Sequence, residues 1–189
     1  MNREYLQKFQ IKDVVFLAIM SAVALATCAV MPLVISLQPL IFGISQLVTA
    51  LQIGVFFAIG LYKVRKPGSL LIMALMMGLI QLMMSPPMFL SSVLNGVLIE
   101  LIVLLLFRGY EKDAAVFCAA MLHTPLSLPF NYLYNRLIKG ADSPLAAVAD
   151  RAPLAAVGMT LAVVAVSALG ALIGIKIARE LKKSGVLKK

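Results

Sequence analysis

One carboxylate, Glu100, stands in one of the most apolar stretches of the 189-residue chain, the run VLIELIVLLL at residues 97–106. No residue in that run can neutralise its charge. An ionisable group at membrane depth costs on the order of 3 kcal/mol or more, so it is by default a candidate functional residue. A carboxylate can pair with an amino group or a protonated ring nitrogen of a ligand. We therefore expect Glu100 to meet a ligand at the floor of a pocket.

Further polar residues recur at helical spacing. His123, Ser127 and Asn131 follow one another every four residues, which puts them on one face of a helix, with Tyr134 close to that face. Asn95 lies one turn and a residue before Glu100. Amides can read polar groups of a ligand, and tyrosines can stack on a flat ring. The candidate substrate-binding residues are Gln46, Gln81, Asn95, Glu100, His123, Asn131, Tyr132 and Tyr134.

Each of these residues also has a structural interpretation. A Gln, Asn or His in a membrane helix often forms an interhelical hydrogen bond worth about 1 kcal/mol. Glu100 could be a protonated acid that is hydrogen-bonded to a neighbour. The Met residues near the end of the span at 69–85 suit flexible packing, or a mobile lid over a pocket.

Catalysis and metal binding find less support in the sequence. An intramembrane enzyme would use Glu100 and His123 as an acid/base pair, but no accompanying nucleophile is evident. His123 is the only histidine, and Cys28 and Cys118 both lie in apolar runs, so we expect no metal site, no disulfide and no cofactor. The chain has no GK[ST] nucleotide-binding loop, so any ATP hydrolysis must come from partners.

The composition of the chain indicates which kind of secondary structure positions these residues. Hydrophobic residues make up 62% of the chain and charged residues 13%, with a mean hydropathy of +1.00, which indicates a multi-pass integral protein of the cell membrane. Because about 20 apolar residues cross a bilayer as a helix, we expect a single all-α domain over residues 1–189, a compact bundle of six transmembrane helices. The expected spans are about 13–37, 39–62, 69–85, 88–107, 114–137 and 153–178.

The distribution of basic residues predicts the orientation. If both termini are cytoplasmic, all of the 17 Lys and Arg residues except Arg136, Lys139 and Arg151 fall on the cytoplasmic side. The positive-inside rule therefore favours this arrangement. The net charge of +9 then faces anionic lipid headgroups, and no nucleic-acid motif accompanies it.

Two stripes of small residues mark faces where helices can approach closely. Ala18, Ala22 and Ala26 form one stripe in the first span, and Gly170, Gly174 and Ala178 form another in the sixth. Either stripe can pack helices of the same chain. The first can instead face outward and dock another membrane subunit, and the sequence leaves both readings open.

Together these features resemble a known family. Six spans in a short chain, the motif AIMSAVALA at residues 18–26, and polar residues gathered toward the outside look like the substrate-binding S component of an energy-coupling factor (ECF) vitamin transporter. The stretch NGVLIEL at residues 95–101 looks most like S components assigned to hydroxymethylpyrimidine or related thiamine precursors.

The resemblance implies a function and partners. The chain would bind a small water-soluble vitamin or precursor from outside, and would not itself be an enzyme. Ala18, Ala22 and Ala26 would dock a transmembrane coupling subunit that carries two cytoplasmic ATPase subunits. A proton-coupled carrier that uses Glu100 remains an alternative, although no inverted repeat is evident. A structural subunit is another, but it would leave Glu100 without a ligand.

Overall fold

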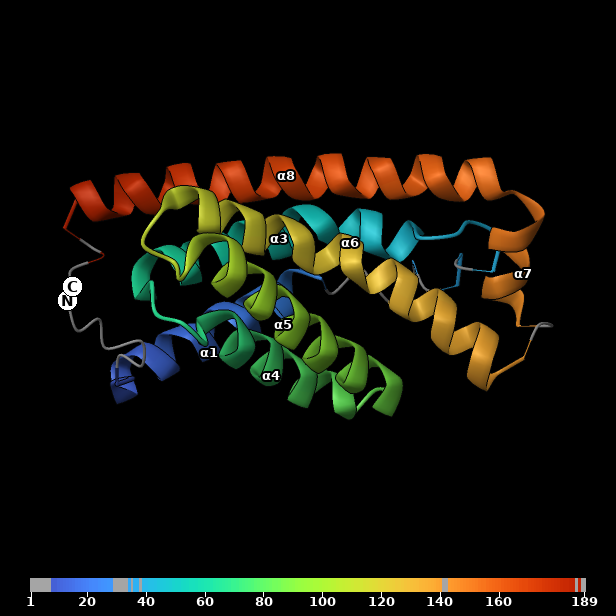
Figure 1. The fold of residues 1–189 in the computed structure, drawn as a ribbon, viewed down its shortest axis with the longest axis horizontal. Helices are drawn as coiled ribbons and strands as arrows, with labels where there is room; N and C mark the ends of the chain where they lie inside the picture. Colours follow the sequence, from blue (N-terminus) through green and yellow to red (C-terminus); the bar gives the residue numbers. More distant parts are fainter. Residues whose placement is uncertain are drawn as a thin grey trace.

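The fold is a bundle of long helices. The computed structural model describes residues 8–28, 34, 36–37, 39–140, 143–185 and 187, and within them all regular structure is helical. The helices are α1 (Ile11–Thr27), α3 (Ile44–Val64), α4 (Ser69–Leu82), α5 (Pro86–Phe107), α6 (Asp113–Ile138), α7 (Pro144–Arg151) and α8 (Pro153–Lys183). Figure 1 shows α8 running the length of the molecule, with the start of α1 and the end of α8 at the same end. We call this the terminal end.

Each of the six expected spans overlaps one helix, and the all-α class is confirmed for the described residues. Three helices, α3, α5 and α8, are long and apolar enough to cross a membrane by length and composition, while α4 is shorter, with 14 residues. The count of six crossings and the cytoplasmic termini therefore stay predictions. The expected end of the first span at residue 37 falls in a stretch of which only Val34, Ser36 and Leu37 are described.

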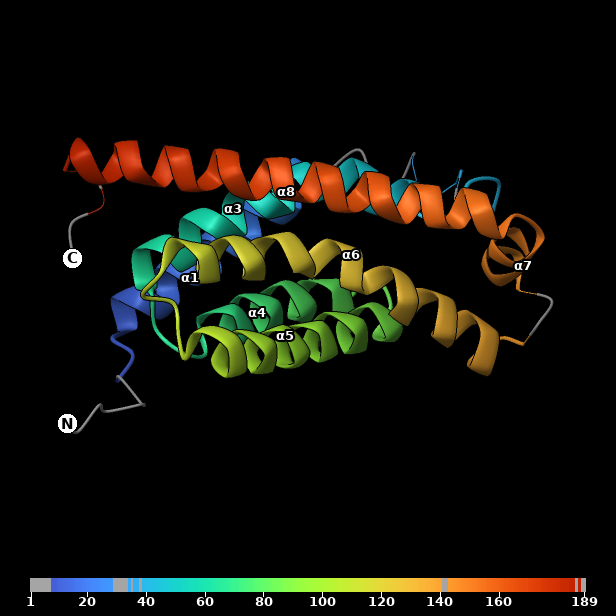
Figure 2. The same cartoon turned by 45° about the horizontal axis from the view of Figure 1, so that its top comes forward.

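Several boundaries differ from the expectation: α3 begins at Ile44, five residues later than expected, α4 ends at Leu82, and α8 continues to Lys183. The helix expected to start at residue 88 begins at Pro86, because a proline is tolerated in the first helical turn, where its missing N–H has no partner to lose. The short helix α7 lies in a segment for which we expected only a connection, and it forms the cap at the end opposite the terminal end in Figures 1 and 2.

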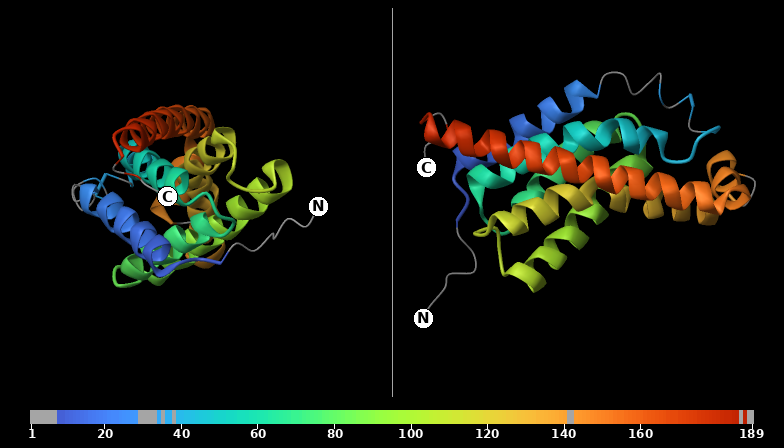
Figure 3. Two further views of the ribbon diagram at one scale, coloured as in Figure 1. Left: turned by 90° about the vertical axis from the view of Figure 1, so that its left-hand side faces the viewer. Right: turned by 90° about the horizontal axis from the view of Figure 1, so that it is seen from above.

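Small residues bring α3 and α8 into close contact. A Cβ added at Gly170 would lie 2.5 Å from the carbonyl oxygen of Leu51, and one added at Gly54 would lie 2.9 Å from the carbonyl oxygen of Ser167. Only glycine permits this approach of the two backbones. Figure 3 shows α8 lying directly over α3 in the view from the terminal end. The stripe in the sixth span therefore packs within the chain.

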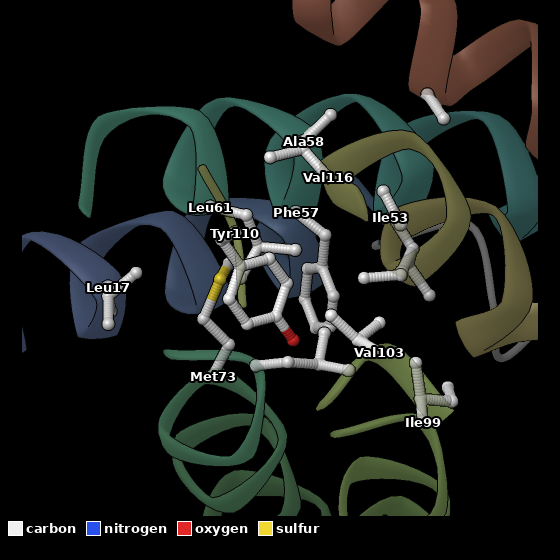
Figure 4. Packing of buried hydrophobic residues seen from close by; sticks show 14 of the residues in the cluster. Leu17, Ile53, Phe57, Ala58, Leu61, Met73, Ile99, Val103, Tyr110 and Val116 are labelled. Atoms are coloured by element: carbon white, nitrogen blue, oxygen red, sulfur yellow. The ribbon is translucent and has the colours of Figure 1, made fainter. Parts of the chain in front are cut away.

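The apolar core lies toward the terminal end, where α1, α3, α4, α5 and α6 meet. Phe57 and Leu61 of α3, Met73 of α4 and Val103 of α5 are fully buried there, together with Tyr110 from the α5–α6 turn (Figure 4). Because Tyr110 inserts its ring into this cluster, the turn is fixed against the bundle.

Ion pairs tie the helix ends together at the terminal end. The carboxylate of Asp113, which begins α6, lies 2.5 Å from Arg65 at the end of α3 and 2.7 Å from Arg179 in α8. Burial alone would raise the pKa of Asp113, but the hydrogen bonds from Arg179 and Arg65 outweigh it and hold that pKa below its ordinary value. The pairs thus join three helices.

Two prolines give α6 its shape. Pro125 and Pro129 lie inside this helix, which changes direction in its second half in Figure 2. A proline at residue 125 cannot donate to the carbonyl of Met121, four residues earlier. Ser167 of α8 takes over, since its hydroxyl donates to that carbonyl at 2.7 Å. The bend carries the second half of α6 away from α8.

Candidate functional site

A cavity of about 660 Å³ opens in the half of the bundle away from the terminal end. Its walls come from the start of α3, the end of α4, the start of α5, the second half of α6 and the start of α7. The size lies within the range of small-molecule binding sites. The bend in α6 and the cap formed by α7 therefore shape a chamber large enough for a vitamin-sized molecule.

Three polar residues of the lining combine near-complete burial with unpaired polar atoms, and we call them the floor: Asn95 of α5 and His123 and Thr124 of α6. Their exposed fractions are 1%, 4% and 3%. Asn95 Oδ1, both ring nitrogens of His123 and Thr124 Oγ1 are buried and have no hydrogen-bond partner among the described residues. Because a buried polar group without a partner is costly, a cluster of them indicates that something else supplies the partners.

The side chains around the floor are hydrogen-bonded within the protein. Ser45 Oγ donates to Gln46 Oε1 at 2.8 Å, and Ser143 Oγ donates to Asn135 Oδ1 at 2.9 Å. Ser92 Oγ donates to the carbonyl of Ala74 at 3.0 Å. Among the described lining residues, the fully buried side-chain atoms that lack a hydrogen-bond partner are thus those of the floor.

The ring of His123 is held in place from one side. It packs against Phe57 of α3 with the ring centroids 4.5 Å apart and the planes tilted by 56°. A neutral imidazole offers one donor and one acceptor. A rigid ring with two unpaired nitrogens is therefore suited to binding a polar ligand.

The structure brings together six of the eight residues expected at the site. Gln46, Gln81, Asn95, His123, Asn131 and Tyr134 all line the cavity. Sequence reasoning missed Thr124 as a site residue, although its position next to His123 was a usable signal. It also missed Asn135, one turn beyond Asn131, and Ser143 before α7.

Glu100 does not line the cavity, and its expected place at the pocket floor is wrong. Its Oε1 accepts the backbone N–H of Gly68 at 2.6 Å, and its Oε2 accepts the hydroxyl of Tyr110 at 3.0 Å. Further backbone hydrogen bonds come from Leu70 and Leu71. The carboxylate satisfies free N–H groups at the start of α4, where the helix dipole also favours negative charge.

Tyr132 also lies outside the cavity. Its hydroxyl donates to Asp150 Oδ1 at 2.8 Å, and Arg136 pairs with the same carboxylate. Tyr132 therefore helps to tie α6 to α7. Of the two tyrosines proposed to stack on a ring, only Tyr134 is in position.

The acid/base pair of an intramembrane enzyme is not formed. Glu100 accepts hydrogen bonds from Gly68 and Tyr110, while the nitrogens of His123 have no hydrogen-bond partner among the described residues. The described part of the chain also contains no group of three or more His, Cys, Asp and Glu residues that could hold a metal ion.

The alanine stripe of α1 faces outward. Ala22 and Ala26 are exposed and Ala18 is half-buried, beside the exposed side chains of Val15 and Ile19. The opposite face of α1 packs inward through Leu17, Ser21 and Ala24. The internal-packing alternative therefore does not hold for Ala22 and Ala26.

Comparison with known families decides where the chain belongs. The sequence model of a family described as "Hypothetical bacterial integral membrane protein (Trep_Strep)" matches residues 11–183, which is nearly the whole chain. The chain belongs to this Trep_Strep family. It is accordingly a multi-pass integral membrane protein, in agreement with its long apolar helices.

A solved structure resembles this Trep_Strep chain in fold. It is described as "Crystal structure of an S-component of ECF transporter" and superposes with a TM-score of 0.64 at 21% identity, covering 95% of this chain and 89% of that chain. None of the curated proteins compared matches the chain. This Trep_Strep chain therefore has the fold of an ECF S component.

Proposed function

We propose that the protein is the substrate-binding S component of an ECF transporter and that the cavity is its substrate site. The observation that carries this proposal is the floor, where Asn95, His123 and Thr124 are almost fully buried yet leave polar atoms unpaired. An apolar membrane bundle gains nothing from such groups unless a polar molecule meets them. The likeness in fold to a solved S component supports the same reading.

The substrate would enter from outside. The cavity lies away from the terminal end, and the terminal end gathers Lys63, Arg65, Lys66 and Arg179. By the positive-inside rule the basic end is cytoplasmic, so the cavity faces the exterior. The substrate would be a small water-soluble vitamin or precursor, with a hydroxymethylpyrimidine-like compound favoured by the resemblance at residues 95–101.

The transport energy would come from partner subunits. The outward stripe Ala22 and Ala26 on α1, flanked by Ala18, offers a surface with little bulk on which a transmembrane helix can pack. We assign this face to a membrane coupling subunit that carries two cytoplasmic ATPase subunits. The proton-coupled carrier loses its main support, because both oxygens of Glu100 are engaged within the protein.

The test is native mass spectrometry of the detergent-purified protein. We expect a small molecule to co-purify with the parent and with Tyr132→Phe, which lies outside the cavity. The variant Asn95→Leu, of similar size, should lose that molecule, since it removes the polar floor. Equal retention by Asn95→Leu, or a protein from which only lipid is released, would contradict the proposal.

A further inference from the structure

Resting on the proposed function, we infer that the substrate site selects uncharged polar molecules and rejects cations. At the floor, the amide of Asn95 and the hydroxyl of Thr124 are uncharged, and burial without a counter-charge favours the neutral imidazole of His123. Each of them offers a donor, an acceptor or both. They match a molecule that presents donors and acceptors on one edge, such as an amide or an amino-substituted ring.

No described residue that lines the cavity is acidic. Moving a cation out of water costs free energy, and only a nearby counter-charge can offset that cost. Glu100, which we expected to meet hydrogen-bond donors or a charge of the ligand, instead caps α4. Asp150 is held by Arg136 and Tyr132 outside the cavity. Asp142, beside Ser143 in sequence, lies outside the described residues.

The charge that does border the cavity is positive. Lys139, in the outer part of the lining, has its ammonium 5.9 Å from the centroid of the Tyr134 ring. A cation entering the cavity would therefore meet a like charge first and a neutral floor afterwards. The ammonium of Lys139 and the uncharged floor both disfavour the binding of a cation, and neither disfavours the binding of an uncharged molecule.

The test places a thiol in the cavity and measures how fast reagents of matched size reach it. In a Cys28→Ala, Cys118→Ala background, Thr124→Cys is treated with 2-hydroxyethyl methanethiosulfonate, which is uncharged, and with 2-aminoethyl methanethiosulfonate, which is protonated at pH 7. Each rate is divided by the rate of the same reagent with free 2-mercaptoethanol. Met83→Cys, in the exposed turn after α4 where 91% of the side chain is accessible, is the control.

We expect the uncharged reagent to modify Thr124→Cys at least tenfold faster than the cationic one, and the two to react about equally at Met83→Cys. Equal rates in the cavity would overturn the charge inference and leave the substrate site standing. A cavity thiol that neither reagent reaches, while Met83→Cys reacts, would instead overturn the site and with it the proposed function. If Thr124→Cys does not fold, Ser127→Cys, one turn further along α6 in the same lining, is measured with the same outcomes.

Discussion

Glu100 Oε1 lies 2.6 Å from the backbone nitrogen of Gly68, so a residue of α5 binds the backbone at the start of α4 across 32 positions of sequence. The second oxygen of the carboxylate holds Tyr110, whose ring is fully buried in the core. One side chain thus joins α4, α5 and the α5–α6 turn. This gives a structural reason for an acid in an apolar helix.

We predict that Glu100→Ala destabilises the protein without changing the affinity of its folded fraction for substrate. The change leaves the N–H of Gly68 and the hydroxyl of Tyr110 without their acceptor, and each unsatisfied group costs about 1 to 3 kcal/mol. We expect a total loss of about 3 kcal/mol, measured as a lower midpoint of thermal unfolding in detergent. A midpoint equal to that of the parent would show that the carboxylate is not a structural anchor.

The sequence predicted which polar residues share a helix face better than it predicted which groups those residues contact. Helical spacing placed His123 and Asn131 on one face, and both line the cavity, because periodicity within a helix is a local property. One partner of Glu100 is a backbone N–H that lies 32 positions away, which no side-chain pattern reveals. The exposure of Ala22 likewise depends on how α1 packs on α3 and α4, so the sequence left two readings open.

The close approach of α3 and α8 predicts a sharp contrast between two glycines of the same helix. Gly170→Ala puts a Cβ 2.5 Å from the Leu51 carbonyl oxygen, whereas a Cβ at Gly158 meets nothing within 4 Å. Overpacking of this kind typically costs about 1 to 3 kcal/mol. We expect Gly170→Ala to lower the unfolding midpoint and Gly158→Ala to leave it unchanged or raise it. Equal midpoints for the two variants would contradict the packing described.

The outward face of α1 predicts a loss of assembly without a loss of binding. Ala22→Trp should abolish capture of the coupling subunit and ATP-driven uptake, because the indole fills the space in which a partner helix packs. Substrate affinity of the isolated protein should stay the same. Ala162→Trp, at an exposed alanine of α8, is the matched control and should assemble normally. If Ala22→Trp assembles as well as its control, the docking face lies elsewhere.

The orientation of the bundle is open to a labelling test in intact cells. In a background without Cys28 and Cys118, a membrane-impermeant maleimide should label Leu154→Cys, whose side chain is 88% exposed at the end with α7. It should label Lys112→Cys, in the turn before α6, only after the membrane is permeabilised. Labelling of both from outside would refute cytoplasmic termini and an outward-facing cavity.

Binding of the substrate at the polar floor is measured most directly by titration. The co-purified molecule is released from the parent protein by denaturation and titrated back into emptied protein. Isothermal titration would compare the parent with Asn95→Leu and with Glu100→Gln, a variant that changes a buried polar residue outside the cavity. Loss of the floor amide should weaken binding by about tenfold or more, corresponding to about 1.4 kcal/mol or more. We predict that Asn95→Leu binds weakly and that folded Glu100→Gln binds like the parent. Parent-like affinity in Asn95→Leu together with weak binding in Glu100→Gln would contradict this prediction.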